Sequence, residues 1–359
     1  MKLITYGHQA FKAILEDIDR AEQSIFIQMF IWRDDHIGNQ LLNHLQSALD
    51  RGVKVTIQKD AYGSIFEKAE ENKQSLFHKD KQKGIHILAK IIDMGYADQR
   101  KPKGYQQKPN EALNKFISHP NLSLSTSILK DHTKFYIIDD TIFYIGGVNI
   151  EDKEDGKDIQ GRTYLDYMVR IDDPQEVNYF LSRFEGKIAY DANRTIEYVM
   201  NRPKDFQVKK DLTVLLNQAN KRILMHMAYF GAKSAMHALF NALNRGVEVT
   251  IVTSKVSNLQ TEYNLYWMHK LQQAGADVFL FEGLVHAKAI LIDDTFIVGS
   301  TNLNNSAYDQ LGECSLVVQG DIALNESFLQ SHKAILSNTI QMKPIKYSKI
   351  KSFFEQLLS

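Results

Sequence analysis

The sequence predicts an α/β fold built from two pseudo-symmetric halves, each a mixed β-sheet flanked by helices, with a functional site at the seam. Three observations indicate this fold. Helix-like and strand-like patterns alternate along the 359 residues, which is typical of α/β proteins. A segment of the first half recurs in the second half. A short motif, H-x-K-x4-D followed by G-[GS]-x-N, occurs once in each half.

The repeat is clearest where a helix ends and a strand begins. Residues 48–57 (ALDRGVKVTI) reappear as residues 242–251 (ALNRGVEVTI). In both copies a glycine marks the helix end and an apolar segment follows, which predicts a strand. Upstream, the strand-like segment 24–30 matches 223–229, and an amphipathic helix is expected before each copy.

The spacing between repeats predicts an insertion in the first half. Gly52 and Gly246 are 194 residues apart, whereas the motif histidines His132 and His286 are 154 apart. About 40 extra residues are therefore expected within residues 61–116, a segment with eleven Lys/Arg and seven Asp/Glu. This segment could be a lid or a membrane-surface contact, and it could equally be a solvated excursion.

Two further expectations concern chain organisation. Within the insertion we expect a helix over 65–76 and a strand over 85–92, with loops elsewhere. A boundary near Pro203 would give an N-terminal half, residues 1–202, and a C-terminal half, residues 203–359.

The duplicated motif suits phosphodiester chemistry. Such a reaction needs a nucleophile, an acid for the leaving oxygen and cations for the developing charge. Histidine can serve as nucleophile or acid because its pKa lies near neutrality. A lysine two residues later on a strand points to the same side. His132 with Lys134, and His286 with Lys288, would therefore surround one phosphate with two imidazoles and two ammoniums.

The tails of the two motifs fit the same chemistry. The small residues would let the backbone pass close to a ligand, and the amides and a hydroxyl could donate hydrogen bonds to phosphate oxygens. These residues are Gly146, Gly147 and Asn149 in the first copy, and Gly299, Ser300 and Asn302 in the second.

The motif aspartates, Asp139 and Asp293, are expected to be structural. Each follows an apolar run, at an odd offset from its histidine that places it on the other face of the strand. We interpret both as turn-fixing or salt-bridging residues. Among the other histidines, His226 has a strand-like setting, but it is expected to be a satisfied structural residue.

The duplicated motif resembles the phospholipase D superfamily over nearly the whole chain. Within it, GGVNI at 146–150 and HAK at 286–288 with GSTNL at 299–303 resemble bacterial cardiolipin synthase-like phosphatidyltransferases. The resemblance implies a phospholipase D-like fold in each half. It also implies transfer of a phosphatidyl group between phospholipids, such as phosphatidylglycerol, with no metal and no organic cofactor.

The resemblance also implies roles for two acids and for the histidines. In the family, an acid after the Asn tail orients a catalytic histidine, and the matching residues here are Asp166 and Glu313. We expect each to serve the histidine of the opposite half. His132 would form a phosphohistidine, with His286 as acid and then base, although the near symmetry of the motifs leaves the reverse assignment open.

This chain departs from the family pattern in several places. Asn304-Asn305-Ser306 stands where the family often has Pro-Arg-Ser, and the insertion at 61–116 has no counterpart that we can place. Alternatives to the transferase therefore stay open. They are a phospholipase D that hydrolyses phospholipids or other phosphodiesters, a metal-independent nuclease, and a non-catalytic binding protein.

The composition narrows the classes of binding partner and the location that we expect for the protein. The 43 Lys/Arg balance the 43 Asp/Glu, so no global basic field favours nucleic acid. Cys314 is the one cysteine, which excludes an intramolecular disulfide. No apolar run would span a bilayer. We expect a cytoplasmic protein, peripheral at most on the inner face of the membrane.

Residues 340–358 predict either a basic amphipathic surface helix or a terminal helix docked on the core.

Overall fold

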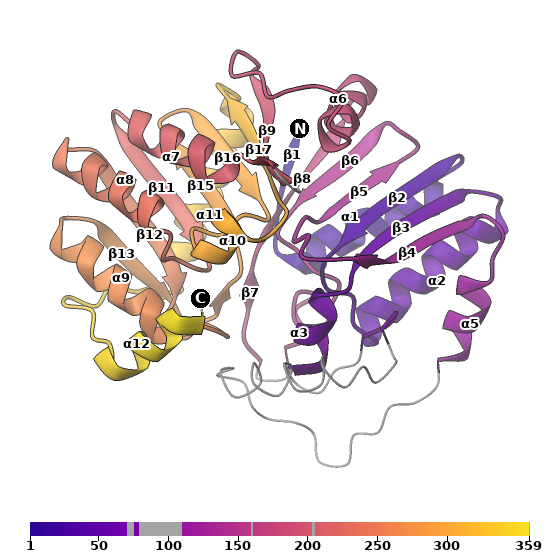
Figure 1. Ribbon diagram of the computed structural model, residues 1–359, viewed down its shortest axis with the longest axis horizontal. Helices are drawn as coiled ribbons and strands as arrows, with labels where there is room; N and C mark the ends of the chain where they lie inside the picture. The colour runs from indigo at the N-terminus through magenta and orange to yellow at the C-terminus, as the bar shows by residue number, and fades with distance from the viewer. Residues whose placement is uncertain (70–74, 79–109, 159–160, 203–204, 359) are drawn as a thin grey trace.

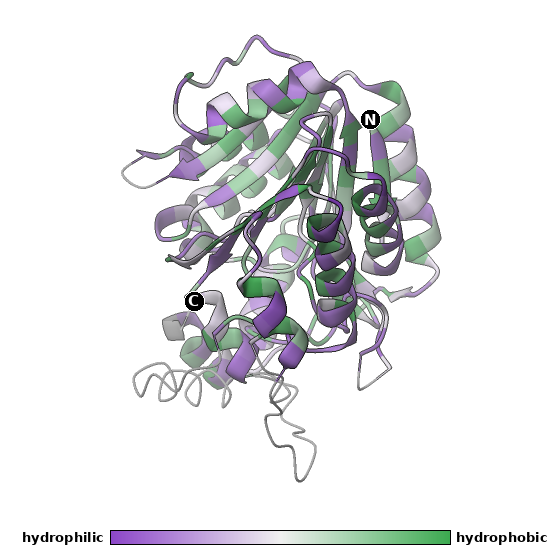
Figure 2. Ribbon diagram, turned by 90° about the vertical axis from the view of Figure 1, so that its right-hand side faces the viewer, coloured by the Kyte–Doolittle hydropathy of each residue, from purple (hydrophilic) through white to green (hydrophobic). Residues whose placement is uncertain are grey.

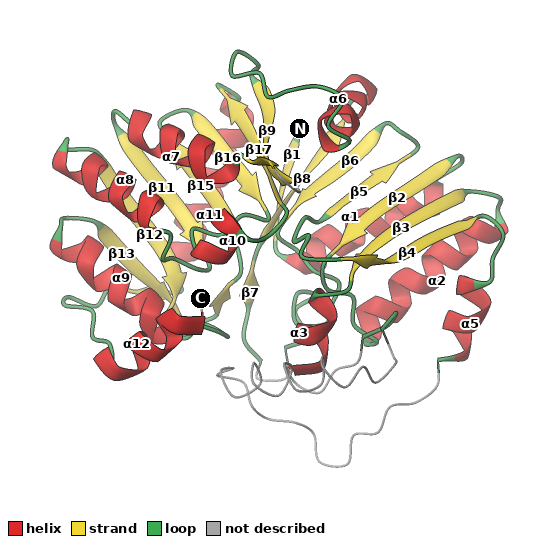
Figure 3. Ribbon diagram, in the orientation of Figure 1, coloured by secondary structure: helices red, strands yellow, loops and turns green. Residues whose placement is uncertain are grey.

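Two β-sheets lie against each other in the computed structural model, with helices on their outer faces (Figure 1). The structure describes residues 1–69, 75–78, 110–158, 161–202 and 205–358. The arrangement confirms the mixed α/β fold with two halves (Figure 3).

The first sheet has seven strands among the described residues, in the order β1-β8-β6-β5-β2-β3-β4. The neighbours β2, β3 and β4 are parallel, and the hairpin β5-β6 pairs antiparallel with β2 on one side and β8 on the other. The strand bounds are β1 (Lys2–Thr5), β2 (Ser24–Met29), β3 (Lys54–Asp60), β4 (Leu122–Ile128), β5 (Phe135–Ile138), β6 (Ile142–Gly146) and β8 (Tyr167–Asp172).

The second sheet repeats this plan and extends it. Its nine strands in the described part of the chain follow the order β10-β9-β17-β16-β15-β11-β12-β13-β18. Here β11, β12 and β13 are parallel, and the hairpin β15-β16 lies between β11 and β17. The strand bounds are β9 (Ile196–Arg202), β10 (Asp205–Phe206), β11 (Arg222–Met227), β12 (Glu248–Ser254), β13 (Asp277–Phe281), β15 (Lys288–Ile292), β16 (Thr295–Gly299), β17 (Glu313–Gln319) and β18 (Thr339–Ile340).

The helices begin and end where local chemistry favours it. Asp35 caps one helix by accepting a hydrogen bond from the N–H of Gly38, and Asp173 caps another that starts with Pro174. The helices are α1 (Gly7–Arg20), α2 (His36–Asp50), α3 (Gly63–Ala69), α5 (Glu111–Ile117), α6 (Pro174–Phe184), α7 (Val208–Gln218), α8 (Lys233–Asn244), α9 (Thr261–Gln273), α10 (Asn305–Asp309), α11 (Ile322–Leu336) and α12 (Lys349–Leu358).

The described residues form three large hydrophobic core clusters. One packs α1 and α2 against the first sheet, and a second packs α7, α8 and α9 against the second sheet. The third fills the space between the sheets, where Phe135 and Phe143 of the first half meet Leu224 and Phe296 of the second, together with side chains of α6 and α11. Figure 2 shows this interior as mostly apolar strands, with hydrophilic residues on the outer helices. Burial of the third core fixes the two halves against each other.

The change from the first sheet to the second comes earlier than residue 203. The last strand of the first sheet ends at Asp172, and β9 (Ile196–Arg202) already pairs with β17 of the second sheet. The division into residues 1–202 and 203–359 remains a proposal. Of the expected insertion, α3 and α5 are described, and the strand expected at 85–92 lies outside the described residues.

The two motif aspartates occupy equivalent hairpins. Asp139 and Asp293 adopt left-handed backbone conformations, with φ of 51° and 53°. The Asp139 carboxylate accepts hydrogen bonds from the backbone N–H groups of residues 22–24, and the Asp293 carboxylate accepts them from residues 220–222. Each aspartate therefore ties its hairpin to the start of the neighbouring strand, at the end of the sheet remote from the motif histidine.

Candidate active site

Two short strand pairings at the seam bring the motifs together. β7 (Tyr164–Leu165) runs parallel to β14 (Leu284–Val285), and the backbone N–H of His286 then donates to the carbonyl of Leu165. On the other side, the N–H of His132 donates to the carbonyl of Gly312. The chain segment just before each histidine therefore pairs with a segment of the opposite half. That second segment leads directly to an acid.

His132 has its Nδ1 atom fixed as a donor. This atom lies 3.0 Å from Glu313 Oε1 and 3.1 Å from the carbonyl oxygen of Ser300. A carbonyl oxygen can only accept, so the shared proton sits on Nδ1 whatever the charge of Glu313. In the neutral ring, Nε2 then carries the lone pair. Burial, followed by the charges of Lys134 and Lys288, holds the pKa of His132 well below 6.5.

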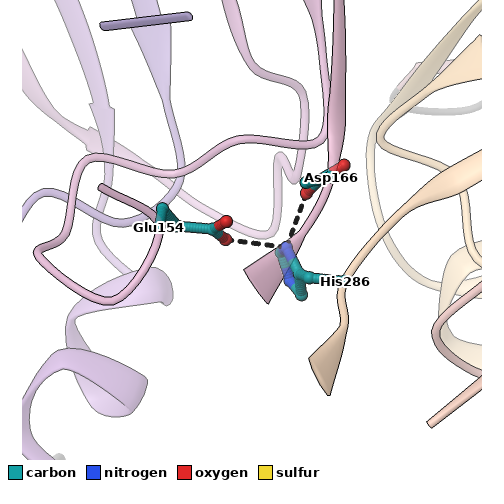
Figure 4. A group of neighbouring side chains, drawn as sticks. All are labelled: Glu154, Asp166 and His286. Carbon is teal, nitrogen blue, oxygen red and sulfur yellow. Dashed lines mark hydrogen bonds and ion pairs between the residues drawn. The ribbon is translucent and has the colours of Figure 1, made fainter. Parts of the chain in front are cut away.

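His286 faces two carboxylates. Its Nδ1 atom lies 2.8 Å from Asp166 Oδ2 and 2.9 Å from Glu154 Oε1, and all three side chains are buried (Figure 4). Burial, followed by the charge of Lys288, lowers the pKa of His286 to about 4, while the bond to Asp166 opposes this shift. Burial, followed by repulsion from Glu151, raises the pKa of Glu154 to about 8.

The two motif lysines are buried cations that hold the same position in each half. Lys134 Nζ donates to the carbonyl of His132, and Lys288 Nζ donates to the carbonyl of His286. Burial, followed by repulsion from Lys288, lowers the pKa of Lys134 to about 7. Burial also lowers the pKa of Lys288. An anion bound between them would relieve both penalties.

The motif asparagines are also placed alike. Asn149 and Asn302 are buried at the ends of their tails, and the Oδ1 atom of each lacks a hydrogen-bond partner among the described residues. A buried polar atom without a partner costs stability, so such atoms are frequent where a ligand completes the site. The unpartnered atom is an acceptor, and turning the amide over places its NH2 donors there instead, which is the orientation that a phosphate oxygen requires.

The small residues of the tails fit protein neighbours, contrary to our expectation of close ligand approach. A Cβ atom at Gly146 would overlap the carbonyl of Tyr167, and one at Gly299 would overlap the carbonyl of Cys314. At Gly147, a Cβ atom would overlap the Asp166 carboxylate. The close approach of β6 to β8, and of β16 to β17, therefore explains why these positions have glycine.

Ser300 likewise serves a protein group. Its hydroxyl donates to the Glu313 carboxylate and accepts from the backbone N–H of Cys314, 3.0 Å away. Burial, opposed by the charge of Lys134, raises the pKa of Glu313 to about 8. We expected this hydroxyl to reach the ligand, but its partners show that it orients Glu313.

Glu154 is a site residue that sequence reasoning missed. It lies in a charge-rich loop, residues 151–155, that carries no recognisable motif. The repeat held one signal, because Glu154 and Ala307 each stand five residues after the tail asparagine of their half. The first half has a buried acid at this position, whereas the second half has a buried alanine at the equivalent position. This difference indicates that the two halves differ in function.

Glu154, Asp166 and His286 also have the composition of a metal site. Their ligand atoms lie within 4.8 Å of one another. However, Lys288 lies close enough for its charge to affect all three groups, and Lys134 also acts on Glu154. Two buried ammoniums oppose a cation, so we assign the cluster to positioning His286.

Aromatic and apolar residues form a wall beside His132. The Phe30 ring meets the His132 ring edge-to-face, with centroids 4.7 Å apart. Phe30 also contacts Tyr62 and Phe66, which pack with α3 and with Leu259 of the opposite half. His132 is thus bordered by aromatic side chains of the first half.

His226 lies outside this centre, in the interface between the sheets. Its Nδ1 is 2.9 Å from the Tyr167 hydroxyl, and its Nε2 is 2.9 Å from His332 Nδ1. The residue is buried and both ring nitrogens have partners. These contacts give it a structural role.

The arrangement defines a duplicated histidine–lysine centre for phosphodiester chemistry, and comparison with known proteins places it in a family. The family described as "Cardiolipin synthase, PLD-like domain" matches residues 14–188 and 212–335. The chain therefore belongs to the cardiolipin synthase group of phospholipase D-like proteins, as the motifs predicted.

Individual relatives agree with this assignment. Cardiolipin synthase 2 of Staphylococcus epidermidis is 26% identical over 95% of this chain and 69% of its own length. The major cardiolipin synthase ClsA of Bacillus subtilis is 24% identical over 84% of this chain and 62% of its own length. The chain thus spans about two thirds of the length of these relatives.

Solved structures show that the fold itself is shared. Phosphatidylserine synthase of Haemophilus influenzae superposes with a TM-score of 0.71 at 13% identity, over 99% of this chain and 91% of that chain. Polyphosphate kinase of Porphyromonas gingivalis superposes with a TM-score of 0.58 at 13% identity, over 99% of this chain and 52% of that chain.

Proposed function

We propose that the protein transfers a phosphatidyl group from one phospholipid, such as phosphatidylglycerol, to the hydroxyl of another, as a cardiolipin synthase does. One observation carries the proposal: two buried H-x-K pairs meet at the seam, each histidine held through Nδ1 by an acid of the opposite half. The family assignment and the names of the relatives support the substrate class.

In the first step, Nε2 of neutral His132 attacks phosphorus and the bond to the leaving glycerol oxygen breaks. His286, as the imidazolium, gives its Nε2 proton to that oxygen. Asp166 favours this charged form of His286, and an anionic phosphodiester favours it further. The product is a phosphohistidine on His132 and a free alcohol.

In the second step, His286 takes the proton of an incoming lipid hydroxyl, whose oxygen attacks phosphorus and releases His132. Lys134, Lys288, Asn149 and Asn302 stabilise the charge on the phosphoryl oxygens in both steps. Two in-line displacements give overall retention at phosphorus. No step requires a metal ion or an organic cofactor from outside the chain.

The acceptor distinguishes this function from its runner-up, hydrolysis. Water would give phosphatidic acid, whereas a second lipid gives cardiolipin. The aromatic wall of Phe30, Tyr62 and Phe66 favours the lipid acceptor, because it limits water beside the phosphohistidine on His132. A nuclease reading has weaker support, since the chain carries no net charge.

The family substrate also implies contact with a membrane. Among the described residues, no helix combines the length and apolarity needed to cross a bilayer. We therefore propose peripheral contact, on the inner face of the cell membrane, as the way in which this part of the chain reaches its lipid.

The test is thin-layer analysis of the lipids formed from labelled phosphatidylglycerol vesicles, with His132→Ala as the matched inactive variant. Cardiolipin and glycerol, both lost in the variant, are the expected products. Phosphatidic acid without cardiolipin would replace transfer by hydrolysis. Peptide mapping after an alkaline quench, which preserves the acid-labile P–N bond, should place the phosphoryl group on the His132 peptide, and finding it on the His286 peptide would reverse the two roles.

A further inference from the structure

The C-terminal helix α12 (Lys349–Leu358) packs on the protein through polar residues. Ser352 is buried, and the Glu355 carboxylate accepts a hydrogen bond from the backbone N–H of Tyr263, 2.8 Å away. That N–H belongs to the first turn of α9 (Thr261–Gln273), where helix N–H groups have no partner within the helix. Glu355 therefore anchors α12 to the N-terminal end of α9.

The opposite side of α12 is apolar and exposed. Ile350, Phe353 and Phe354 are 73%, 58% and 61% exposed to solvent. Their spacing of three and four residues places them on one face, directly opposite Ser352 and Glu355. Docked amphipathic helices normally bury the apolar face, so this helix is inverted with respect to its own protein.

Lysines border this apolar face. Successive residues of a helix are rotated by about 100°. Lys349 and Lys351 therefore lie on the two flanks of the apolar face, and Lys346 precedes the helix. All three side chains are exposed. An apolar strip between ammoniums complements an anionic lipid surface, in which the apolar residues enter the acyl region and the lysines reach the phosphates.

The position of α12 fits the same surface. The first turn of α9 follows the carboxyl end of β12 through residues 255–260, and Ser254 at that strand end bonds the backbone N–H of Val285, next to His286. In Figure 1, α12 lies in the lower part of the molecule with β7 and α3, which border the site. α12 and the segments that border the site thus belong to one end of the molecule.

We propose that α12 is the membrane-docking surface of this protein, and that it lies in the lipid interface of anionic membranes with the active site at the same end. The inference rests on the proposed function, because it takes a lipid surface as the occupant of the exposed face. Docking at this end would present phospholipid headgroups to the histidines without extracting a whole lipid into water.

The experiment is vesicle flotation of the full chain with phosphatidylcholine vesicles that contain or lack phosphatidylglycerol. The triple variant Ile350→Gln/Phe353→Gln/Phe354→Gln should lower the vesicle-bound partition by roughly 10- to 100-fold. A second variant, Lys346→Gln/Lys349→Gln/Lys351→Gln, should lower binding to phosphatidylglycerol vesicles alone, by roughly fivefold per lysine at low salt.

A matched control comes from the far end of the second sheet. Ile322 is as exposed as Ile350, at 73%, and it follows β17 at the end remote from His286. Ile322→Gln should bind vesicles as the wild type does. Unchanged binding of the α12 triple variant, with a normal melting temperature, would overturn the proposal. Loss of a dimer in that variant with vesicle binding intact would also overturn it, in favour of self-association.

Activity on a monomeric substrate separates this inference from the function it rests on. The α12 variants should turn over water-soluble short-chain phosphatidylglycerol at the wild-type rate, while losing activity on vesicles. His132→Ala should show the reverse pattern, with vesicle binding intact and turnover lost. If the wild type binds vesicles through α12 but never transfers a phosphatidyl group, the proposed function fails and the docking surface stands.

Discussion

Glu313 Oε1 lies 3.0 Å from Nδ1 of His132, although 181 residues separate the two in sequence and they belong to opposite halves. The same exchange joins Asp166 to His286, across 120 residues. Neither half therefore contains a complete histidine–acid pair. The exchange follows from the backbone pairings beside Leu165 and Gly312, which align each histidine segment with the acid segment of the other half.

Gly147→Ala should impair catalysis through Asp166. The added Cβ would overlap the Asp166 carboxylate and push it from His286. We expect kcat to fall by about 10²-fold, as for other misplaced catalytic groups. Ser300→Ala, at the equivalent position, has room for its Cβ and loses one bond to Glu313, so a decrease of about tenfold is expected. Steady-state kinetics of both variants test this prediction. Equal and small decreases in kcat would contradict it.

Lys134 should make anion binding depend on pH. The pKa of Lys134 is lowered to about 7 in the empty site, first by burial and then by Lys288. A bound anion favours the charged ammonium, so sulfate binding should take up a proton and weaken by up to about tenfold per pH unit above pH 7. Calorimetry between pH 6 and 9 measures this. Lys134→Met should bind weakly with little pH dependence, and a constant wild-type affinity would refute the prediction.

Glu313 should reduce stability at alkaline pH. Burial raises its pKa to about 8, and His132 is neutral in the folded protein well below 6.5. Between about pH 4.5 and 8 the folded protein thus holds a proton on Glu313 that the unfolded chain has lost, so its contribution to stability falls as pH rises through this window. Relative to the wild type, Glu313→Gln should gain up to about 2 kcal/mol by pH 8. Melting curves at pH 6 and pH 8 test this, and an identical difference at both would contradict it.

Asp293→Ala should destabilise the fold and leave the chemistry intact. The substitution removes the acceptor of three backbone N–H groups and places alanine in a left-handed conformation. We expect a loss of about 2–3 kcal/mol in the free energy of unfolding, with kcat nearly unchanged below the melting transition. Asp294→Ala, at the exposed neighbour, serves as control. A large loss of kcat in folded Asp293→Ala protein would assign the aspartate to catalysis.

Much of this organisation was predictable from the sequence, because it is periodic. The duplicated motifs predicted a site at the seam, and the repeat around Gly52 and Gly246 predicted two similar sheets. What the sequence could not supply depends on three-dimensional packing. The contact of Glu154 with His286 arises from a loop without periodicity, and the need for glycine at Gly147 comes from the carboxylate of Asp166, between β7 and β8.

The sheet boundary shows the same limit. We expected a boundary near Pro203, but β9 already belongs to the second sheet, because strand pairing with β17 leaves no local signature in the sequence. The inverted orientation of α12 was equally hidden, because a basic amphipathic pattern does not state which face meets the protein.

Because each half supplies the acid that holds the histidine of the other half, the two histidines could acquire different roles. The proton affinity of His132 depends on Glu313 and Ser300 in the second half, and that of His286 depends on Glu154 and Asp166 in the first. A substitution in one repeat therefore changes the proton affinity of the histidine in the other repeat. After the duplication, drift in either copy would have altered its twin, so nucleophile and acid could diverge while both H-x-K motifs stayed the same.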